Sequence, residues 1–466
     1  MLTLELVRQK ELPLYQQIYE AIKKDILSGV LEPREKLPSK RKLAAELRVS
    51  QTTVETAYSQ LKAEGYIYSQ AKSGYYVERL LTSFPDSEPV QAPIAQEAKI
   101  RKYRYDFQTG GVIIDCFPFS TWAKLTRETL SEDKDKLLSA TPSKGLYELR
   151  REICQLLRRS RGVEVQPEQV IVGAGWEYLL GLIIQILGRH KVYGIEDPGY
   201  PKASLILGKL AEQQVYLPVD AEGVSLNHLG GFGPEVIHVT PSHHFPLGIV
   251  TSARRRGELL RWAEQGAGRY IIEDDYDSEF RLYGRPIPSI YGLDRGEHVI
   301  YIKTFTRSLA PSLRLAYMVL PPSLLKIYDE ELYFYTSTVP RLEQHVLARF
   351  LNGGYLERHL NRVRNIYRKN RKAFLAVIKG SSLAERITVF RDDGGSHLLL
   401  QVQGFSEEEL VKKAAQAGIN ILGISSYYKG EIPPRYRNAV VVGYSGFTEA
   451  ELPLAAAELL KAWGQG

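Results

Sequence analysis

One stretch, KTFTRSLAPSLRLAY at positions 303–317, brings together side chains that could do chemistry. It holds the amine of Lys303, the guanidinium groups of Arg307 and Arg314, and several hydroxyls. Hydroxyls and a guanidinium fork can hold a phosphate, and a lysine amine can form a covalent bond with an aldehyde. The stretch is therefore open to three interpretations: a solvated surface turn, a phosphate cradle, or a site of covalent lysine chemistry.

Similar groups of unusual residues follow other β-type segments. Runs such as QVIVGAG, VIHVTPSHHFPLG, RYIIEDDYD and HVIYIKTF alternate with helical segments, a pattern that predicts an α/β fold with a mainly parallel sheet. In such sheets ligands bind at the carboxyl ends of the strands. A single group of this kind is usually an ordinary loop, but five such groups at strand ends predict a ligand-binding site. They lie at 173–177, 196–200, the 240s, 274–276 and 303–317.

A pyridine cofactor with a phosphate arm would need a carboxylate for its ring nitrogen, an aromatic face, phosphate ligands and a lysine for its aldehyde. Asp274 follows the run YIIE and is placed for the ring nitrogen, and Tyr276 could reach the ring oxygen. Tyr200 could stack on the ring. The expected phosphate ligands are Thr304, Thr306 and Arg314.

Length and composition describe the chain that must position these residues. Its 466 residues exceed one ordinary core and predict two or three domains. Charged residues at 25% and hydrophobic ones at 44% are typical of a soluble globular protein. No apolar run reaches the length of a membrane span, and the start lacks a signal-peptide core, so we expect a cytoplasmic protein.

The net charge and the cysteines bear on which ligands and partners the chain could bind. The net charge of +7 permits an anionic partner without demonstrating one. The two cysteines, Cys116 and Cys154, form neither a disulfide framework nor the spacing of a metal site, so no metal is expected.

The first 80 residues predict a winged helix-turn-helix. An apolar stripe runs through LPLYQQIYEAIKKDIL, and two further helices are expected to begin after the N-caps Ser39 and Ser50. The aromatic runs YIY and YYV around a turn predict a two-stranded wing. A small three-helix bundle of another purpose remains the alternative, since this geometry also occurs outside DNA binding.

The segment KLPSKRKLAAELRVSQTTVETAYSQLKAEGYIYSQAKSGYYV resembles the winged helix of the GntR family of bacterial regulators. The resemblance implies a double-stranded DNA operator as partner. Where that family usually has Arg after the capping Ser, this chain has Gln51, whose amide can pair with adenine. The positions that match the family's DNA-facing residues are Ser39, Arg41, Ser50, Gln51, Thr52, Thr53 and Gly74.

Residues 81–104, rich in Pro, Ser and charge, are interpreted as a flexible linker. Residues 105–466 resemble the fold type I aminotransferases, and the fusion resembles the MocR subfamily of regulators, through IEDPGYP, TPSHHFPLG, IIEDDYDSEFR and LAPSLRLAY. The resemblance implies a large part at about 120–325, a small C-terminal α+β part at about 350–466, a head-to-tail homodimer and pyridoxal phosphate as cofactor. The implied cofactor-site residues are Gly175, Trp176, Tyr200, Asp274, Tyr276, Thr304, Thr306, Arg307 and Arg314.

The chain departs from that subfamily at the residues that catalysis needs. Alignment on LAPSLRLAY puts Arg307 at the position of the Schiff-base lysine, and a guanidinium cannot act as a free amine. Lys303, four residues upstream, is interpreted as a solvated or phosphate-side cation. Glu177 replaces a Gln beside the phosphate, where a carboxylate is repulsive unless compensated.

Two further departures concern the substrate side. Leu247 replaces the Thr of the usual Pro-Thr-Gly, and Val441 stands where the substrate-carboxylate Arg should be, although Arg435 and Arg437 are close in sequence. No catalytic residue is therefore assigned.

Three functions remain open. The first is a DNA-binding transcription regulator whose aminotransferase-like domain dimerises and senses an unknown small-molecule effector without catalysis. The alternative is a working pyridoxal phosphate-dependent aminotransferase with an attached DNA-binding module. The third is an architectural dimer that regulates without a ligand. The pocket would hold pyridoxal phosphate non-covalently or another anionic ligand, or it would be empty.

Overall fold

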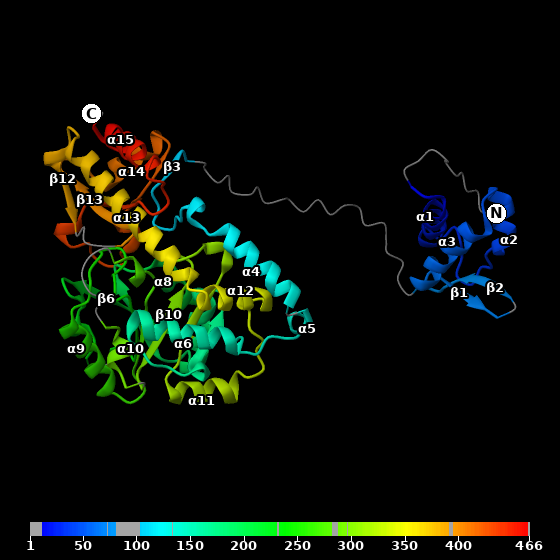
Figure 1. Cartoon of the computed structure of the whole chain (residues 1–466), viewed down its shortest axis with the longest axis horizontal. Coiled ribbons are helices and arrows are strands. Elements are labelled where there is room, and N and C mark those ends of the chain that lie inside the picture. Colours follow the sequence, from blue (N-terminus) through cyan, green and yellow to red (C-terminus); the bar gives the residue numbers. More distant parts are fainter. Residues whose placement is uncertain are drawn as a thin grey trace. The chain divides into compact units, whose positions relative to one another are not determined.

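The computed structural model describes residues 12–71, 73–80, 103–132, 134–230, 233–281, 288–295, 297–390 and 395–464. The chain divides into two compact units, Met1–Ile100 and Arg101–Gly466 (Figure 1). Most of the expected linker, residues 81–102, lies outside the described residues. Within the described part of the chain, no helix is both long enough and apolar enough to cross a membrane.

The described part of the first unit is three helices followed by a β-hairpin. Its elements are α1 (Leu14–Leu27), α2 (Lys40–Leu47), α3 (Gln51–Ala63), β1 (Ile67–Gln70) and β2 (Gly74–Val77). The expected caps are confirmed, because Ser39 Oγ accepts the Lys42 N–H and Ser50 Oγ accepts the Thr53 N–H. β1 and β2 pair antiparallel and form the predicted wing. The apolar faces of the three helices share one core with the hairpin.

The large part of the second unit is built on an eight-stranded sheet with the order β4-β11-β10-β9-β8-β5-β6-β7. The run from β10 to β6 is parallel, whereas β11 is antiparallel to both its neighbours, β10 and β4. The strands are β4 (Val170–Gly173), β5 (Val192–Asp197), β6 (Gln213–Asp220), β7 (Gly223–Val224), β8 (Val236–Val239), β9 (Tyr270–Asp274), β10 (Val299–Thr304) and β11 (Ala316–Val319). The mainly parallel sheet is confirmed.

Helices pack against this sheet, in which β4, β8, β10 and β11 are buried along their whole length. The helices before and along the sheet are α4 (Phe119–Glu132), α5 (Lys134–Leu137), α6 (Tyr147–Arg161), α7 (Trp176–Leu187), α8 (Pro201–Leu210), α9 (Ala253–Glu264), α10 (Ile290–Leu293), α11 (Pro322–Glu331) and α12 (Arg341–Asn352). Helix α7 buries apolar residues all round, as expected for a helix covered on both sides.

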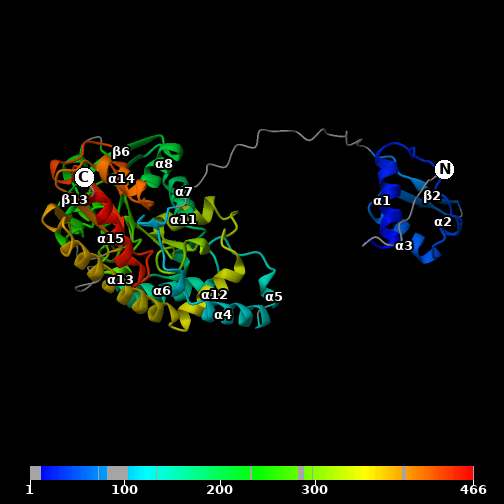
Figure 2. The same ribbon diagram turned by 90° about the horizontal axis from the view of Figure 1, so that it is seen from above.

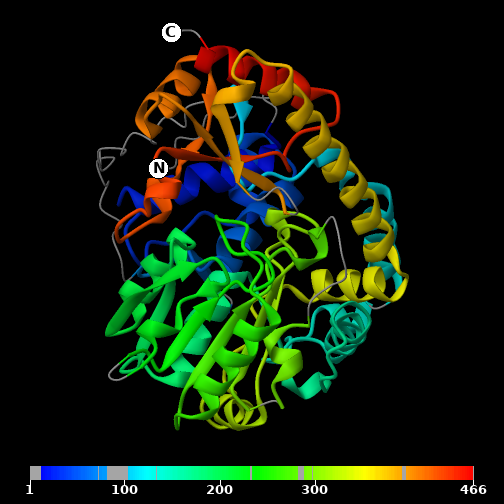
Figure 3. The same ribbon diagram turned by 90° about the vertical axis from the view of Figure 1, so that its left-hand side faces the viewer.

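The small part is an antiparallel sheet, β12-β13-β16-β15, covered by helices. The long helix α13 (Tyr355–Lys379) runs beside both parts of the unit (Figure 3), and α15 lies alongside it (Figure 2). The remaining elements are β3 (Tyr105–Asp106), β12 (Ile387–Phe390), β13 (His397–Val402), α14 (Glu407–Gln416), β14 (Ile419–Asn420), β15 (Leu422–Gly423), β16 (Ala439–Gly443) and α15 (Glu451–Gly464). β3 pairs with β14, so the start of the unit is tied to its small part.

Candidate functional site

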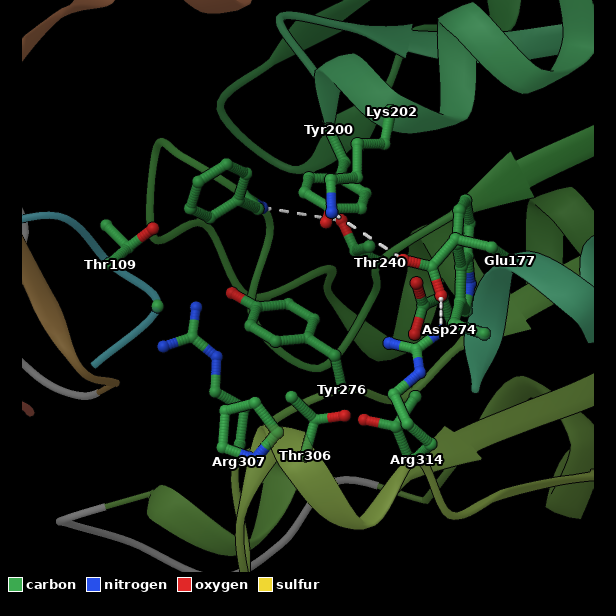
Figure 4. Close-up of a pocket in the computed structure, with 15 residues that line it drawn as sticks. Thr109, Glu177, Tyr200, Lys202, Thr240, Asp274, Tyr276, Thr306, Arg307 and Arg314 are labelled. Atoms are coloured by element: carbon green, nitrogen blue, oxygen red, sulfur yellow. Dashed lines mark hydrogen bonds and ion pairs between the residues drawn. The ribbon is translucent and has the colours of Figure 1, made fainter. Parts of the chain in front are cut away.

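A pocket of about 280 Å³ opens at the carboxyl ends of β8, β9 and β10 (Figure 4). The chain leaves each of these strands with a polar residue, and the parallel pairing of the strands brings these residues to one edge of the sheet. The lining residues are Thr109, Gly110, Trp176, Glu177, Tyr200, Lys202, Thr240, Phe245, Asp274, Tyr276, Thr304, Thr306, Arg307, Pro311 and Arg314.

The structure brings together all but one of the residues expected to surround a cofactor. Gly175 does not line the pocket; it N-caps α7 with φ +96° and lies under the side chain of Arg314, so that a Cβ on it would lie 2.4 Å from Arg314 Nη2. Residues 303–317, the opening stretch of the sequence, form the end of β10, the start of β11 and the loop between them. That loop carries Arg307 and Arg314, the two arginines among the described residues that line the pocket.

Some lining residues escaped the sequence reasoning. Thr240 and Phe245 belong to the expected group in the 240s, but they were not singled out there. Lys202 lies two residues beyond Tyr200 at the start of α8, and the strand-end argument could have reached it. Thr109 and Gly110 precede the sheet in the chain and follow no strand of it, so no local signal marked them.

The buried carboxylate of Asp274 is the polar centre of the pocket. Asp274 Oδ2 lies 3.4 Å from His238 Nε2, and its Oδ1 has no hydrogen-bond partner among the described residues. Burial raises the pKa of Asp274, although His238 opposes the shift. A ligand that offers a hydrogen-bond donor or a positive charge would satisfy this carboxylate.

A second buried carboxyl group, that of Glu196 at the end of β5, interacts electrostatically with Asp274. Glu196 Oε2 accepts hydrogen bonds from the backbone N–H of Thr240 at 3.1 Å and from its hydroxyl at 2.6 Å. Burial raises the pKa of Glu196 to about 7, against these two bonds. Glu196 therefore changes its charge near neutral pH without touching the pocket.

Aromatic rings form the walls. Trp176 and Tyr200 meet edge to face with centroids 5.6 Å apart, and Phe245 lies 6.2 Å from Tyr200 and 6.3 Å from Tyr276 in the same manner. Trp176 Nε1 is buried and has no hydrogen-bond partner among the described residues. The walls suit a flat ring, and an acceptor on that ring would satisfy the indole.

The Tyr276 hydroxyl connects the pocket to the small part of the unit. It lies 3.1 Å from His243 Nδ1, which is also 2.9 Å from Asp277 Oδ2. The ring of His243 lies 5.5 Å from that of His397 on β13. Gly395, two residues before His397, also lies close to the His243 ring. A Cβ at position 395 would be 2.0 Å from His243 Cε1.

The two arginines of the loop have different surroundings. Arg314 Nη2 donates to Glu177 Oε2 at 2.7 Å, and Lys202 Nζ lies 3.6 Å from Glu177 Oε1, so the carboxylate expected to repel a phosphate is compensated by two cations. Arg307 Nη1 is buried without a hydrogen-bond partner among the described residues. In Figure 4 its guanidinium points away from Arg314, on the side of Thr109.

The interpretation of Lys303 as a solvated or phosphate-side cation is wrong. Lys303 is buried and does not line the pocket; its Nζ donates to Glu279 Oε2 at 2.5 Å and to the Asp275 carbonyl at 3.0 Å. Side chains alternate between the two faces of a strand, and the next residue, Thr304, faces the pocket. The amine of Lys303 therefore lies on the other face.

The residues considered for binding a substrate carboxylate do not line the pocket. Val441 and Leu247 are buried in an apolar cluster that includes Phe245. Arg435 donates to the hydroxyl of Tyr436, and Arg437 pairs with Glu431 at 2.8 Å. None of these four side chains is among the residues that line the pocket.

In the first unit, the expected DNA-facing residues gather at two helix starts and on the hairpin. Ser39 and Arg41 lie at the exposed start of α2. Ser50, Gln51 and Thr52 are exposed at the start of α3, and Thr53 is half-buried. Gly74 begins β2 with φ +125°.

Each of the two units matches a known protein family. Residues 14–77 match the family of bacterial regulatory proteins named gntR, and residues 114–457 match the aminotransferase class I and II family. The chain is 35% identical over 459 residues to the probable rhizopine catabolism regulatory protein MocR of Rhizobium meliloti, covering 95% of this chain and 92% of that one. The chain belongs to the MocR-type GntR regulators.

Other regulators of this kind are similar along their whole length. The chain is 40% identical over 458 residues to the uncharacterized HTH-type transcriptional regulator YdeL of Bacillus subtilis, covering 98% of each chain. It is 30% identical over 454 residues to the HTH-type pyridoxine biosynthesis transcriptional regulator PdxR of Corynebacterium glutamicum, covering 97% of this chain and 96% of that one.

Solved structures of aminotransferases share the fold of the second unit. A kynurenine aminotransferase of Pyrococcus horikoshii matches with a TM-score of 0.66 and 22% identity over 78% of this chain and 90% of that one. An archaeal alanine:glyoxylate aminotransferase matches with a TM-score of 0.68 and 21% identity over 77% and 90%. At this identity the likeness establishes the fold type I aminotransferase architecture and nothing about activity.

Proposed function

We propose that this protein is a DNA-binding transcription regulator whose aminotransferase-like domain binds a small-molecule effector and is catalytically silent. One observation carries the proposal: Arg307 lines the pocket beside Tyr276 and Thr306, in a chain that also carries a GntR-type winged helix. Relatives along the whole chain bear the names of regulators, which supports the regulatory role.

Catalytic silence follows from the chemistry of Arg307. We place this residue at the position of the Schiff-base lysine, and a guanidinium that stays protonated cannot attack an aldehyde. Lys303 cannot take over, because its amine lies on the other face of β10 in a buried ion pair. Lys202 is the lysine among the described lining residues, and its amine is paired with Glu177.

The pocket fits only part of the cofactor that the family implies, pyridoxal phosphate. Asp274 and the aromatic walls suit a protonated pyridine ring, with Tyr276 at the ring oxygen. Its aldehyde would meet the guanidinium of Arg307 instead of a lysine amine, and Arg314, which would hold the phosphate with Thr304 and Thr306, already pairs with a carboxylate. Any binding of the cofactor is therefore proposed to be non-covalent, and no reaction step is assigned to it.

The DNA-binding role is assigned to the first unit. The N-terminus of a helix attracts phosphates, and short hydroxyl and amide side chains there can reach base edges. The exposed start of α3 offers Ser50, Gln51 and Thr52 for a double-stranded operator. We assign Arg41 to the phosphate backbone.

We also propose that the protein is a head-to-tail homodimer. Large apolar side chains are exposed at several points of the second unit, and the aminotransferase fold is one in which a partner subunit covers such surface. They include Ile114, Phe119, Leu138, Tyr147, Tyr333 and Phe334. Sedimentation at micromolar concentration should give twice the chain mass; a stable DNA-competent monomer would contradict this assembly.

The visible spectrum of the protein with pyridoxal phosphate, before and after borohydride, tests catalytic silence. We expect no reducible band and no phosphopyridoxyl adduct on any peptide that lines the pocket. An adduct on Lys202 would favour the aminotransferase instead, since that amine borders the pocket. Operator binding by the same preparation tests the regulatory role separately.

A further inference from the structure

One end of the pocket already contains an anion, the carboxylate of Glu177. Glu177 lies in the first turn of α7, its Oε2 2.7 Å from Arg314 Nη2 and its Oε1 3.6 Å from Lys202 Nζ. Figure 4 shows this carboxylate beside the guanidinium, with Lys202 on its other side. Proteins often bind a phosphate with a helix N-terminus and nearby cations. Here the carboxylate of Glu177 lies at the helix N-terminus and pairs with both cations.

The guanidinium that meets Glu177 is half-exposed and has further contacts within the chain. Arg314 Nη2 also donates to the carbonyl of Ala174 at 3.3 Å. The same nitrogen packs against the α-carbon side of Gly175, where no Cβ could be accommodated. Arg314 itself takes a left-handed backbone conformation with φ +50°, which sets the direction of its side chain. Turning Arg314 away from Glu177 would therefore break its hydrogen bonds to Glu177 and to the Ala174 carbonyl.

Glu177 is held in its charged form. Partial burial raises the pKa of its carboxyl, but the hydrogen bond from Arg314, a bond from its own backbone N–H and the charge of Lys202 outweigh burial, and the net pKa lies below the usual value. A second anion at this place would meet a full negative charge. It would bind only by displacing that charge from its partners.

The pocket also contains buried polar atoms that lack hydrogen-bond partners among the described residues. Asp274 and Trp176 are both more than nine-tenths buried, and Asp274 Oδ1 and Trp176 Nε1 have no hydrogen-bond partner among the described residues. Arg307 Nη1 is in the same situation. Buried polar atoms without partners are costly, so a ligand with a donor for Asp274 and acceptors for the two N–H groups would be strongly favoured.

We propose that the pocket selects an unphosphorylated planar nitrogen heterocycle, with Glu177 standing where the phosphate of a phosphorylated ligand would bind. The ring nitrogen donates to Asp274, the ring lies between the aromatic walls, and its acceptor substituents face Trp176 and Arg307. Glu177 is then the residue that determines specificity against phosphate esters. This inference rests on the proposed role of the pocket as the effector site.

Pyridoxine and pyridoxine 5′-phosphate form a matched pair of probes, because they differ only in the phosphate and neither has an aldehyde that could react with lysines. Calorimetric titration of the full-length protein should show that the phosphate ester binds no tighter than pyridoxine. In Glu177→Gln, the affinity for the phosphate ester relative to that for pyridoxine should rise at least tenfold. Adding Arg314→Ala to that variant should remove the gain, and inorganic phosphate should bind only to Glu177→Gln.

Glu330→Gln is the control, because it removes a carboxylate from a surface pair with Lys326 outside the pocket, and it should keep the wild-type ratio. A thermal unfolding transition for each variant checks the fold, and Glu177→Ala repeats the test with a smaller side chain. The proposal is overturned if the wild type prefers the ester tenfold, if Glu177→Gln leaves the ratio unchanged, or if neither probe binds either protein. Operator binding by the same proteins is measured in parallel, so a failure of the regulatory role is seen separately.

Discussion

Lys303 Nζ and Glu279 Oε2 are 2.5 Å apart in the interior, with the two side chains 11% and 8% exposed. Lys303 Nζ also lies 3.7 Å from Asp275 Oδ2, and Arg161 Nε lies 3.3 Å from the same oxygen. Although burial lowers the pKa of Lys303, the two carboxylates outweigh it and keep the amine charged. The lysine nearest to Arg307 in the stretch is thus part of the structural core and not of the pocket.

Replacing Lys303 with Met should destabilise the protein by about 3–5 kcal/mol, because it leaves Glu279 buried without its cation and Asp275 with Arg161 alone. Denaturant unfolding monitored by circular dichroism measures the change. Lys326→Met removes a lysine from an exposed pair on α11 and should cost less than about 1 kcal/mol. Equal effects of the two substitutions would show that the buried pair contributes nothing of its own.

Arg307→Lys should create a borohydride-fixable adduct with pyridoxal phosphate, because it places an amine among Asp274, Tyr276 and Thr306. Mass spectrometry of the reduced protein should locate a phosphopyridoxyl group on the peptide that carries position 307. Transamination should not appear, since Val441 is buried in an apolar cluster and offers no clamp for a substrate carboxylate. An adduct on Lys303 of the wild type would contradict both the placement of Arg307 and the buried ion pair.

Substitutions in the first unit should separate affinity from specificity. Arg41→Ala should weaken binding to every DNA sequence and lower the salt slope by about 1, because Arg41 is assigned to a phosphate. Gln51→Ala should change which bases are preferred and cost about 1–3 kcal/mol on the operator. Binding titrations on operator and scrambled DNA at several salt concentrations measure both. Wild-type behaviour of both variants would contradict the winged-helix assignment.

Glu196→Gln should change how stability depends on pH. Burial raises the pKa of Glu196 from 4.5 to about 7, so between these values the folded protein keeps a proton that the unfolded chain releases. The contribution of this carboxyl to stability is therefore complete below pH 4.5 and is lost as pH rises through 7. The variant should match the wild type near pH 4.5 and exceed it by about 3 kcal/mol at pH 8. The unfolding free energies of both proteins are measured at the two pH values. The same difference between variant and wild type at both would contradict this expectation.

Local patterns made much of the fold predictable. Ser39 and Ser50 begin their helices because an N-cap needs only a side chain and an N–H three residues on, both in the same short stretch. Asp274 and Tyr276 were found because parallel strands end at one edge of the sheet, a rule that needs no knowledge of distant contacts. The family match of both units is consistent with these inferences.

Contacts between distant segments were not predictable. Glu177 and Arg314 are 137 residues apart, and neither sequence neighbourhood shows that one will bind the other. Lys303 could have been assigned to the far face by alternation along β10, but its partners Asp275 and Glu279 come from the segment after β9. Thr109 reaches the pocket from a segment with no strand of the large sheet before it.

The contact between His243 and Gly395 sets a limit on how the pocket can change size. Tyr276 forms one wall and shares a hydrogen bond with His243, whose ring has no room to retreat where Gly395 approaches. Gly395 leads directly into β13 of the small part. We therefore expect a ligand that pushes Tyr276 outward to press, through His243, on the segment that leads into β13, so the width of the pocket is tied to the position of the small part.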